Sequence, residues 1–267
     1  MTSQSDTDAR HGNVTPPPEV RNFRDLGGIE NREGRTLRFG RIFRSGHFGA
    51  TTREYRTSLN TRGVRRIDLR GADEIALEDA ELPDAAEALR GPSYVAEDDA
   101  VWSALRSGRL DKLAPTFTAT RAAEVMMRLY GSTIASHVPL YRDCFAELLA
   151  DEHPVVIHCS AGKDRTGWAV AILLTVLDVP EERIIADYLE SSHPDRQYVI
   201  RDESGAPVPT DDETRLVLAP LLEARPEYLA HAWDAVTRSW GSRTAYIEDG
   251  LGITADRRAA FQAQLLQ

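Results

Sequence analysis

The sequence predicts an α/β fold with a central, mostly parallel sheet flanked by helices. Residues 154–158 form a short apolar stretch of the kind that is buried on both faces of a parallel sheet. Residues 64–70 alternate apolar and polar side chains, as a strand does. Segments with helical spacing separate these strand candidates, and that order of elements is typical of a parallel α/β layer fold.

The N-terminal part of the chain predicts a tail and then a pair of strands. Residues 1–18 are polar and end in three consecutive prolines, so we expect a disordered tail followed by one domain over residues 19–267. Residues 20–45 contain two adjacent glycines, a turn signal at 31–34 and alternating apolar positions beyond it. This pattern predicts two strands joined by a turn.

Helical signals lie on both sides of the strand at 64–70. The spacing from Thr51 to Glu54 is that of a capping box, and it predicts a helix that ends at Gly63. Between residues 101 and 150 the apolar positions recur at helical spacing. Residues 93–96 are a further strand candidate, and later helices are predicted at 166–177, from Pro180 onward, and at 212–223, 226–240 and 254–266, with a loop at 202–211.

Composition and charge exclude several classes of protein. The 267 residues carry a net charge of −10, so no broad positive field attracts nucleic acid, and we expect no nucleic-acid partner. No apolar run approaches the roughly 20 residues of a membrane helix, so we expect no integral membrane segment. Two cysteines do not make a disulfide framework. Because the N-terminus lacks the apolar core of a secretory signal, we expect a cytoplasmic protein, or one secreted without a recognisable signal peptide.

The segment from His158 to Gly167 carries the chemistry. A buried strand ends there, a short turn follows and a helix begins, which points free N–H groups and the positive end of a helix dipole into one concavity. Such a nest binds a tetrahedral anion such as phosphate. The guanidinium of Arg165 adds a planar fork that holds two phosphate oxygens at once. The predicted phosphate-binding residues are Ser160, Ala161, Gly162, Lys163, Asp164 and Arg165.

Cys159 lies at the mouth of this predicted nest. The N–H groups and dipole that bind phosphate also stabilise a thiolate, so Cys159 is the expected catalytic nucleophile. Attack on phosphorus gives a phosphocysteine that water hydrolyses, with charge stabilisation by Arg165 and the loop amides, and without a metal or other cofactor. Thr166 is a candidate hydrogen-bond donor to the sulfur when it leaves in the second step.

The ten residues from His158 to Gly167 resemble the signature loop of cysteine-dependent protein tyrosine phosphatases, and the Lys163-Asp164-Arg165 version is similar to that of bacterial atypical members. The resemblance covers about residues 20–266. It implies a protein tyrosine phosphatase-like fold, a helical lid at about residues 101–138, and a phosphoprotein or a phospholipid headgroup as substrate. Further matches are Asn22 to Gly28, Phe43 to Gly46, Ile67 to Arg70, Ala186 to Leu189, Arg225 to Tyr228 and Gly250 to Gly252.

The resemblance also implies a general acid inside the loop, at Asp164. Bacterial atypical members are thought to use this aspartate, and a carboxyl group beside an anionic phosphate holds its proton more readily. The alternatives are Asp68, at the end of its strand, and the Asp98-Asp99 pair. Asp68 equally suits a salt bridge in the scaffold, and the aspartate pair suits a solvated loop. We expect His158 to orient the loop rather than to donate a proton.

Lys163 adds a positive charge beyond what one phosphate requires. The chain has only two lysines among 32 basic residues, so lysine at this position stands out. A second basic group suits substrates with more than one phosphate, and the Gly-Lys-x-Arg pattern is similar to loops of phosphoinositide phosphatases. We therefore expect hydrolysis of phosphotyrosine that extends to phosphoserine or phosphothreonine and to phosphoinositides. Ser160 stands where some relatives carry an apolar residue.

Two other classes of function fit parts of the pattern. A catalytically silent phosphate-binding module would keep the nest without turnover, although Cys159, Arg165 and Thr166 are all present. A redox or sulfur-transfer protein would use Cys159 with Cys144 as the resolving thiol, but an arginine fork does little for thiol exchange. A buried helix position is the default for Cys144. The remaining histidines show no metal-ligand spacing, and no metal site is expected from them: His11, His47, His137, His153, His193 and His231.

Overall fold

Three parallel strands and one antiparallel strand make the central sheet of the computed structural model, which describes residues 19–49, 51–78, 98–150 and 152–267. Both β2 and β3 run parallel to β4, and β1 runs antiparallel to β2. The predicted α/β fold with a mostly parallel sheet is therefore confirmed. The strand order is β1 (Arg24–Asp25), β2 (Ile42–Ser45), β4 (Val155–His158) and β3 (Arg65–Asp68).

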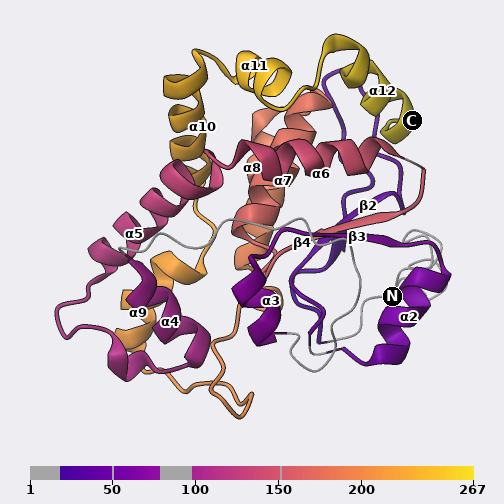
Figure 1. Ribbon diagram of the computed structural model, residues 1–267. Helices are drawn as coiled ribbons and strands as arrows, with labels where there is room; N and C mark the ends of the chain where they lie inside the picture. The colour runs from indigo at the N-terminus through magenta and orange to yellow at the C-terminus, as the bar shows by residue number, and fades with distance from the viewer. Residues whose placement is uncertain (1–18, 50, 79–97, 151) are drawn as a thin grey trace.

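Helices separate and follow the strands (Figure 1). In chain order they are α2 (Arg53–Thr61), α3 (Ala72–Glu78), α4 (Asp99–Ser107), α5 (Ala119–Arg128), α6 (Val138–Ala150), α7 (Asp164–Val176), α8 (Glu181–Leu189), α9 (Asp212–Leu222), α10 (Pro226–Trp240), α11 (Arg243–Ala245) and α12 (Ala255–Leu265). Short 3-10 turns are η2 (Leu110–Lys112) and η4 (Glu190–Ser192), and π-helical turns are η3 (Leu129–Ile134) and η5 (Tyr246–Gly250).

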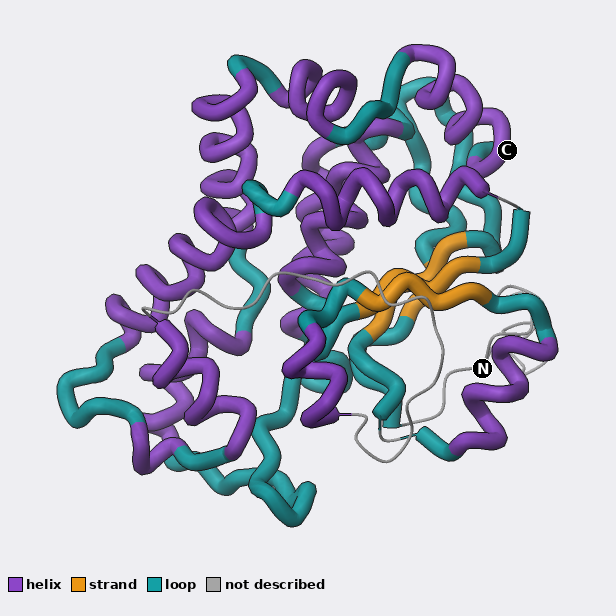
Figure 2. Tube along the Cα trace, in the orientation of Figure 1, coloured by secondary structure: helices purple, strands orange, loops and turns teal. Residues whose placement is uncertain are grey.

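Side chains of the sheet alternate between two apolar clusters, because successive residues of a strand point to opposite faces. Ile42 and Ile157 belong to the larger cluster, together with apolar side chains of α6 and α7. Phe43 and Val156 belong to the smaller cluster, with Leu59 of α2. Figures 1 and 2 accordingly show α2 on one side of the sheet and α6 and α7 on the other. Every residue of β4 is buried, as its apolar sequence predicts.

The register of the sheet brings three strand ends together. Ser45 of β2 and Asp68 of β3 both lie opposite His158, the last residue of β4. The segments that follow these three parallel strands therefore start at the same edge of the sheet. In open α/β sheets this carboxyl edge is where ligands bind.

The elements differ from the sequence-based expectation in three respects. The side chain that caps α2 is Thr52, which accepts the N–H of Tyr55, rather than Thr51. Helix α7 begins at Asp164, two residues earlier than predicted, and so includes Asp164 and Arg165 in its first turn. Helix α3 was not predicted at all. The strand candidate at 93–96 and the tail at 1–18 lie outside the described residues.

Three helices form a group away from the sheet. Helices α5 and α9 pack against each other, and Figure 1 shows α4 beside them. The stretch at 101–138 that the resemblance assigns to a lid comprises most of α4, all of α5 and the π-helical turn η3. None of the helices within the described ranges is long and apolar enough to span a bilayer.

The last residues of the chain pair with the segment between β1 and β2. The N–H of Thr36 donates to the carbonyl of Gln267 (3.1 Å), and the N–H of Gln267 donates to the carbonyl of Thr36 (2.9 Å). The N–H of Arg38 donates to the carbonyl of Leu265 (2.8 Å). Residues 36–38 and 265–267 therefore hold each other although the whole fold lies between them in sequence.

Candidate active site

The loop after β4 turns sharply at Gly162. Gly162 has φ +67°, a left-handed conformation that favours glycine. A Cβ atom at this position would lie 2.3 Å from the carbonyl carbon and oxygen of Ser45, so no larger residue fits without displacing the end of β2. The turn lets helix α7 begin at once, at Asp164.

Two side chains from the N-terminal segment hold the carbonyl groups of this loop. Nδ2 of Asn22 donates to the carbonyls of Gly162 (2.8 Å) and Ala161 (3.2 Å). The guanidinium of Arg44 donates to the carbonyl of Gly162 (2.7 Å). In a trans peptide the N–H points away from the C=O, so the amides of Gly162 and Lys163 point to the opposite side of the loop. This is the arrangement of an anion nest.

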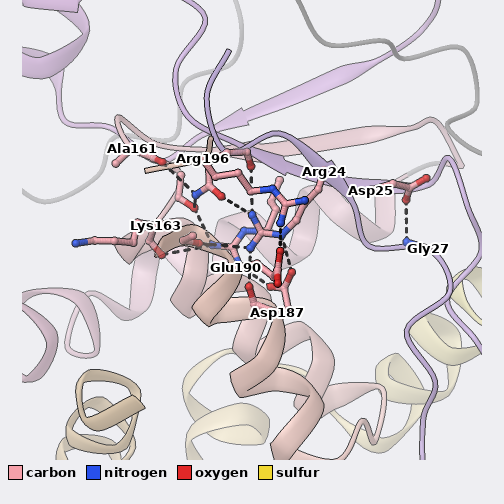
Figure 3. A network of polar contacts seen from close by, with 12 residues as sticks. Arg24, Asp25, Gly27, Ala161, Lys163, Asp187, Glu190 and Arg196 are labelled. Atoms are coloured by element: carbon pink, nitrogen blue, oxygen red, sulfur yellow. Dashed lines mark hydrogen bonds and ion pairs between the residues drawn. The ribbon is translucent and has the colours of Figure 1, made fainter. Parts of the chain in front are cut away.

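An ion network fixes these two anchors in turn (Figure 3). Asp187 of α8 binds Nε of Arg24 (2.7 Å) and NH1 of Arg44 (2.5 Å), and Arg24 also donates to the side chain of Asn22. Burial alone would raise the pKa of Asp187, but Arg44 and Arg24 outweigh it and keep that pKa below its usual value. Segments that are far apart in sequence, around Asn22, Arg44 and Asp187, thus meet beside the loop. Asn22 and Arg44 bind its backbone carbonyls, and Asp187 holds Arg44 in place.

The guanidinium of Arg165 is oriented by Glu74 of α3. Its two terminal nitrogens donate to the two carboxylate oxygens of Glu74, at 2.5 and 2.7 Å, and NH1 also donates to the carbonyl of Leu69 (3.3 Å). Ser160 Oγ and the N–H of Gly71 donate to the same carboxylate. Burial raises the pKa of Glu74, but Arg165 outweighs it and lowers that pKa to about 2.

Glu74 is a residue of the site that the sequence reasoning missed. Its only local signal is an acidic side chain in the first turn of a helix, three residues after Gly71 and directly beyond the strand beside β4. That signal is common at helix N-termini, where carboxylates offset the helix dipole. The pairing of Glu74 with Arg165 depends on how α3 packs against the loop, which local sequence does not show.

Cys159 lies at the base of a small cavity. Cys159 is only 2% exposed. The cavity has a volume of about 70 Å³, well below the roughly 300–1,000 Å³ of common ligand pockets. The loop, Glu74 of α3, helices α4 and α9, and Tyr198 contribute to its lining. Its lining comprises Glu74, Trp102, Leu105, Arg106, Cys159, Ser160, Ala161, Lys163, Asp164, Arg165, Tyr198, Leu221 and Leu222.

The carboxylate of Asp164 lines the same cavity and receives one strong hydrogen bond. Tyr130 of η3 donates its hydroxyl to Asp164 Oδ1 (2.8 Å), and the Tyr130 hydroxyl also lies 2.6 Å from that of Tyr188. Burial and the charge of Asp164 raise the pKa of Tyr130 well above its ordinary value, so this hydroxyl keeps its proton. Cys159, Asp164 and Arg165, the three catalytic candidates from the sequence, thus line one cavity.

The ammonium group of Lys163 turns toward the end of α9. Its Nζ donates to the carbonyls of Leu221 (2.6 Å) and Glu223 (3.2 Å) and lies 3.6 Å from Asp164 Oδ1. Burial lowers the pKa of Lys163. Its charge therefore binds carbonyls at the C-terminal end of α9, where cations stabilise a helix, although Lys163 also lines the cavity.

The other general-acid candidates are engaged elsewhere. Asp68 pairs with Arg70 in two places (2.9 and 2.6 Å) and does not line the cavity. Burial raises the pKa of Asp68, but His158 and Arg70 outweigh it and bring that pKa to about 2. Asp98 binds Arg128 through both oxygens (2.6 and 3.0 Å), and Asp99 lies at 3.9 Å from Arg106.

The remaining predicted residues, His158 of β4, Thr166 of α7 and Cys144 of α6, are buried. Burial lowers the pKa of His158 to about 4, although Asp68 opposes this, so the imidazole is neutral at physiological pH. Thr166 is fully buried, and among the described residues its hydroxyl has no hydrogen-bond partner. Cys144 is buried in α6, and burial raises its pKa. No group of three metal-ligating side chains occurs within the described residues.

Comparison with known proteins agrees with this arrangement. Residues 15–267 match the model of the tyrosine phosphatase family. A Cupriavidus necator protein assigned as a tyrosine-protein phosphatase is 31% identical over 244 residues, which cover 88% of this chain and 82% of the relative. The triple specificity protein phosphatase PtpB of Mycobacterium tuberculosis is 30% identical over 260 residues, 87% of this chain and 92% of the relative.

A shorter match is a tyrosine-protein phosphatase of Nostoc commune, 28% identical over 153 residues, 56% of this chain and 48% of that protein. The family model covers nearly the whole chain, and the two longer relatives align over 88% and 87% of it. With the strand, the glycine turn and the arginine-bearing helix in place, the chain belongs to the tyrosine phosphatase family.

Proposed function

We propose that this chain hydrolyses phosphotyrosine through a phosphocysteine intermediate on Cys159. The observation that carries the proposal is that Cys159 and the guanidinium of Arg165 line one cavity, together with a loop whose carbonyls are bound by Asn22 and Arg44. The inward amides and Arg165 would bind the three non-bridging oxygens of the phosphate. In that position the sulfur faces phosphorus for in-line attack.

The reaction has two steps. In the first, the thiolate of Cys159 forms an S–P bond while the bond from phosphorus to the tyrosine oxygen breaks, and Asp164 gives its proton to that oxygen. In the second, water attacks phosphorus, the S–P bond breaks, and Asp164 takes a proton from the water. Arg165 and the loop amides stabilise the charge of both transition states without changing protonation.

The geometry favours Asp164 over Asp68 as general acid, because Asp164 lines the cavity with Cys159 while Asp68 is bound to Arg70. We assign His158, Thr166 and Asp68 supporting roles beneath the loop. The name of the mycobacterial relative, a triple specificity phosphatase, supports extending the substrates to phosphoserine or phosphothreonine. Phosphoinositides would need the ammonium of Lys163 to leave the carbonyls of α9 before it could meet a second phosphate.

The first experiment is hydrolysis of 4-nitrophenyl phosphate near pH 6 with EDTA present, comparing wild type with Cys159→Ser. Turnover by wild type that EDTA does not inhibit, and none by the variant, supports the thiolate mechanism. If wild type binds phosphate without turnover, the chain is a silent phosphate-binding module. If Cys159→Ser retains turnover, the phosphocysteine mechanism is wrong.

A further inference from the structure

A second, larger depression adjoins the catalytic cavity. Its volume is about 520 Å³, against about 70 Å³ for the cavity that holds Cys159. Ser160, Ala161 and Tyr198 line both of them. A substrate that places its phosphate in the loop and extends past these three residues therefore enters the depression.

The depression is lined by basic side chains. Arg21, Arg201 and His47 line it, and Glu19 is the only carboxylate among the described residues of its lining. One guanidinium nitrogen of Arg21 donates to the carbonyl of Asp195 (3.3 Å), and one of Arg201 donates to the carbonyl of Gly205 (2.7 Å). Within the described residues no carboxylate pairs with either group, so most of their five N–H donors are available to a ligand.

This placement is unusual for an acidic chain. The molecule carries a net charge of −10, and many of its arginines bind a neighbouring carboxylate, as Arg24, Arg44 and Arg165 do. Two arginines without such a partner at one depression leave a local positive potential. Lys163, which the sequence offers as the second positive group of the site, is instead held by the carbonyls of α9.

We propose that this depression binds an acidic residue that neighbours the phosphotyrosine of a peptide substrate, with Arg21 and Arg201 as its partners. The inference rests on the proposed function, which places the phosphate in the adjoining loop. The volume is several times that of the phosphate cavity and matches a residue or two of extended chain. A membrane surface is a poorer occupant, because anionic lipid repels a chain of this net charge.

The test compares two phosphotyrosine peptides that differ only in the residues beside phosphotyrosine, glutamate in one and glutamine in the other. Each is assayed with wild type, the double variant Arg21→Gln/Arg201→Gln, and the control Arg238→Gln, which removes one exposed charge from α10. At low salt, wild type and the control should prefer the acidic peptide by about fivefold in kcat/KM, since partly exposed ion pairs are individually weak. The double variant should lose this preference but keep its turnover of 4-nitrophenyl phosphate.

The affinity of the same peptides for Cys159→Ser, measured with and without the two arginine substitutions, tests the subsite even if no turnover occurs. Absent turnover by wild type would refute the proposed function, while a preference in binding would still support the subsite. Equal binding of the two peptides, or a preference that survives the double substitution, overturns the subsite. Loss of activity on soluble inositol polyphosphates alone, with peptide preference intact, would assign the depression to a headgroup instead and likewise overturn it.

Discussion

The hydroxyl of Tyr130 donates a 2.8 Å hydrogen bond to Oδ1 of Asp164, across 34 residues of sequence. Tyr130 is fully buried and lies on the π-helical turn η3, and single π turns within helices often occur at functional sites. Burial keeps the hydroxyl protonated, so it acts as a donor only toward the carboxylate. The contact fixes the direction of the proposed general acid above the loop.

Tyr130→Phe should therefore impair protonation of the leaving group. We expect kcat for phenyl phosphate to fall by about tenfold, because a misplaced acid commonly costs a factor of 10 to 100. The fall for 4-nitrophenyl phosphate should be smaller, since its leaving group needs less protonation. Tyr55→Phe on α2, which stacks on Phe48, is the matched control. An equal fall on both substrates would show that Tyr130 only supports the fold.

Glu74→Gln should destabilise the protein through Arg165. The change leaves a buried guanidinium without its counter-charge, which costs about 3 kcal/mol in the free energy of unfolding. Inorganic phosphate should restore part of that loss, because an anion in the loop supplies the missing charge. Thermal and urea unfolding with and without phosphate measure both effects.

The control for this prediction is Glu147→Gln. Glu147 pairs with Arg65 where both side chains are about one third exposed, so its loss should cost less than about 1 kcal/mol and should not respond to phosphate. If the two substitutions lower the free energy of unfolding equally, the Glu74–Arg165 pair does not stabilise the fold more than an exposed ion pair does.

Acid should weaken the fold in two stages. Burial lowers the pKa of His158 from 6.5 to about 4. As the pH falls, the imidazole is therefore protonated in the unfolded chain before it is protonated in the folded protein. The free energy of unfolding, which has its full value above pH 6.5, falls as the pH decreases toward 4. The pKa values of Glu74 and Asp68 lie at about 2, so their contributions are present above pH 4.5 and are lost toward pH 2.

For the first stage we expect the free energy of unfolding to fall by on the order of 3 kcal/mol between pH 6.5 and 4. His158→Gln should show a much smaller fall over the same range. Urea titrations at pH 7, 5.5 and 4 give the comparison. A fall in the variant as large as that in wild type would contradict the role of His158.

Gly162→Ala should abolish turnover and destabilise the protein more than strain alone would. Gly34 provides the matched comparison, since it also has positive φ (+78°) but a Cβ atom there would meet nothing within 4 Å. Gly34→Ala should cost about 1 kcal/mol from backbone strain and leave activity intact. Gly162→Ala adds the collision with the Ser45 carbonyl, and equal stability of the two variants would disprove that collision.

Local signals were enough to predict the order of strand, turn and helix around Cys159 and Arg165. An apolar strand, a glycine and a helix start follow one another within about a dozen residues, so Cys159 and Arg165 could be placed from the sequence. Contacts between distant segments could not. Glu74 required α3 to be placed against the loop, and the direction of Lys163 depends on Leu221, 58 residues further on. The early start of α7 followed from the tightness of the Gly162 turn, which periodicity does not reveal.

The pairing of residues 36–38 with 265–267 has a consequence for synthesis of the protein in the cell. The segment that carries Thr36 leaves the ribosome long before its partners at residues 265–267. During elongation the backbone groups of Thr36 and Arg38 have no partner at this edge, and the segment must wait for some 230 residues. Closure of this edge therefore comes late in synthesis, and until residues 265–267 emerge the backbone groups of Thr36 and Arg38 are open to other partners, chaperones among them.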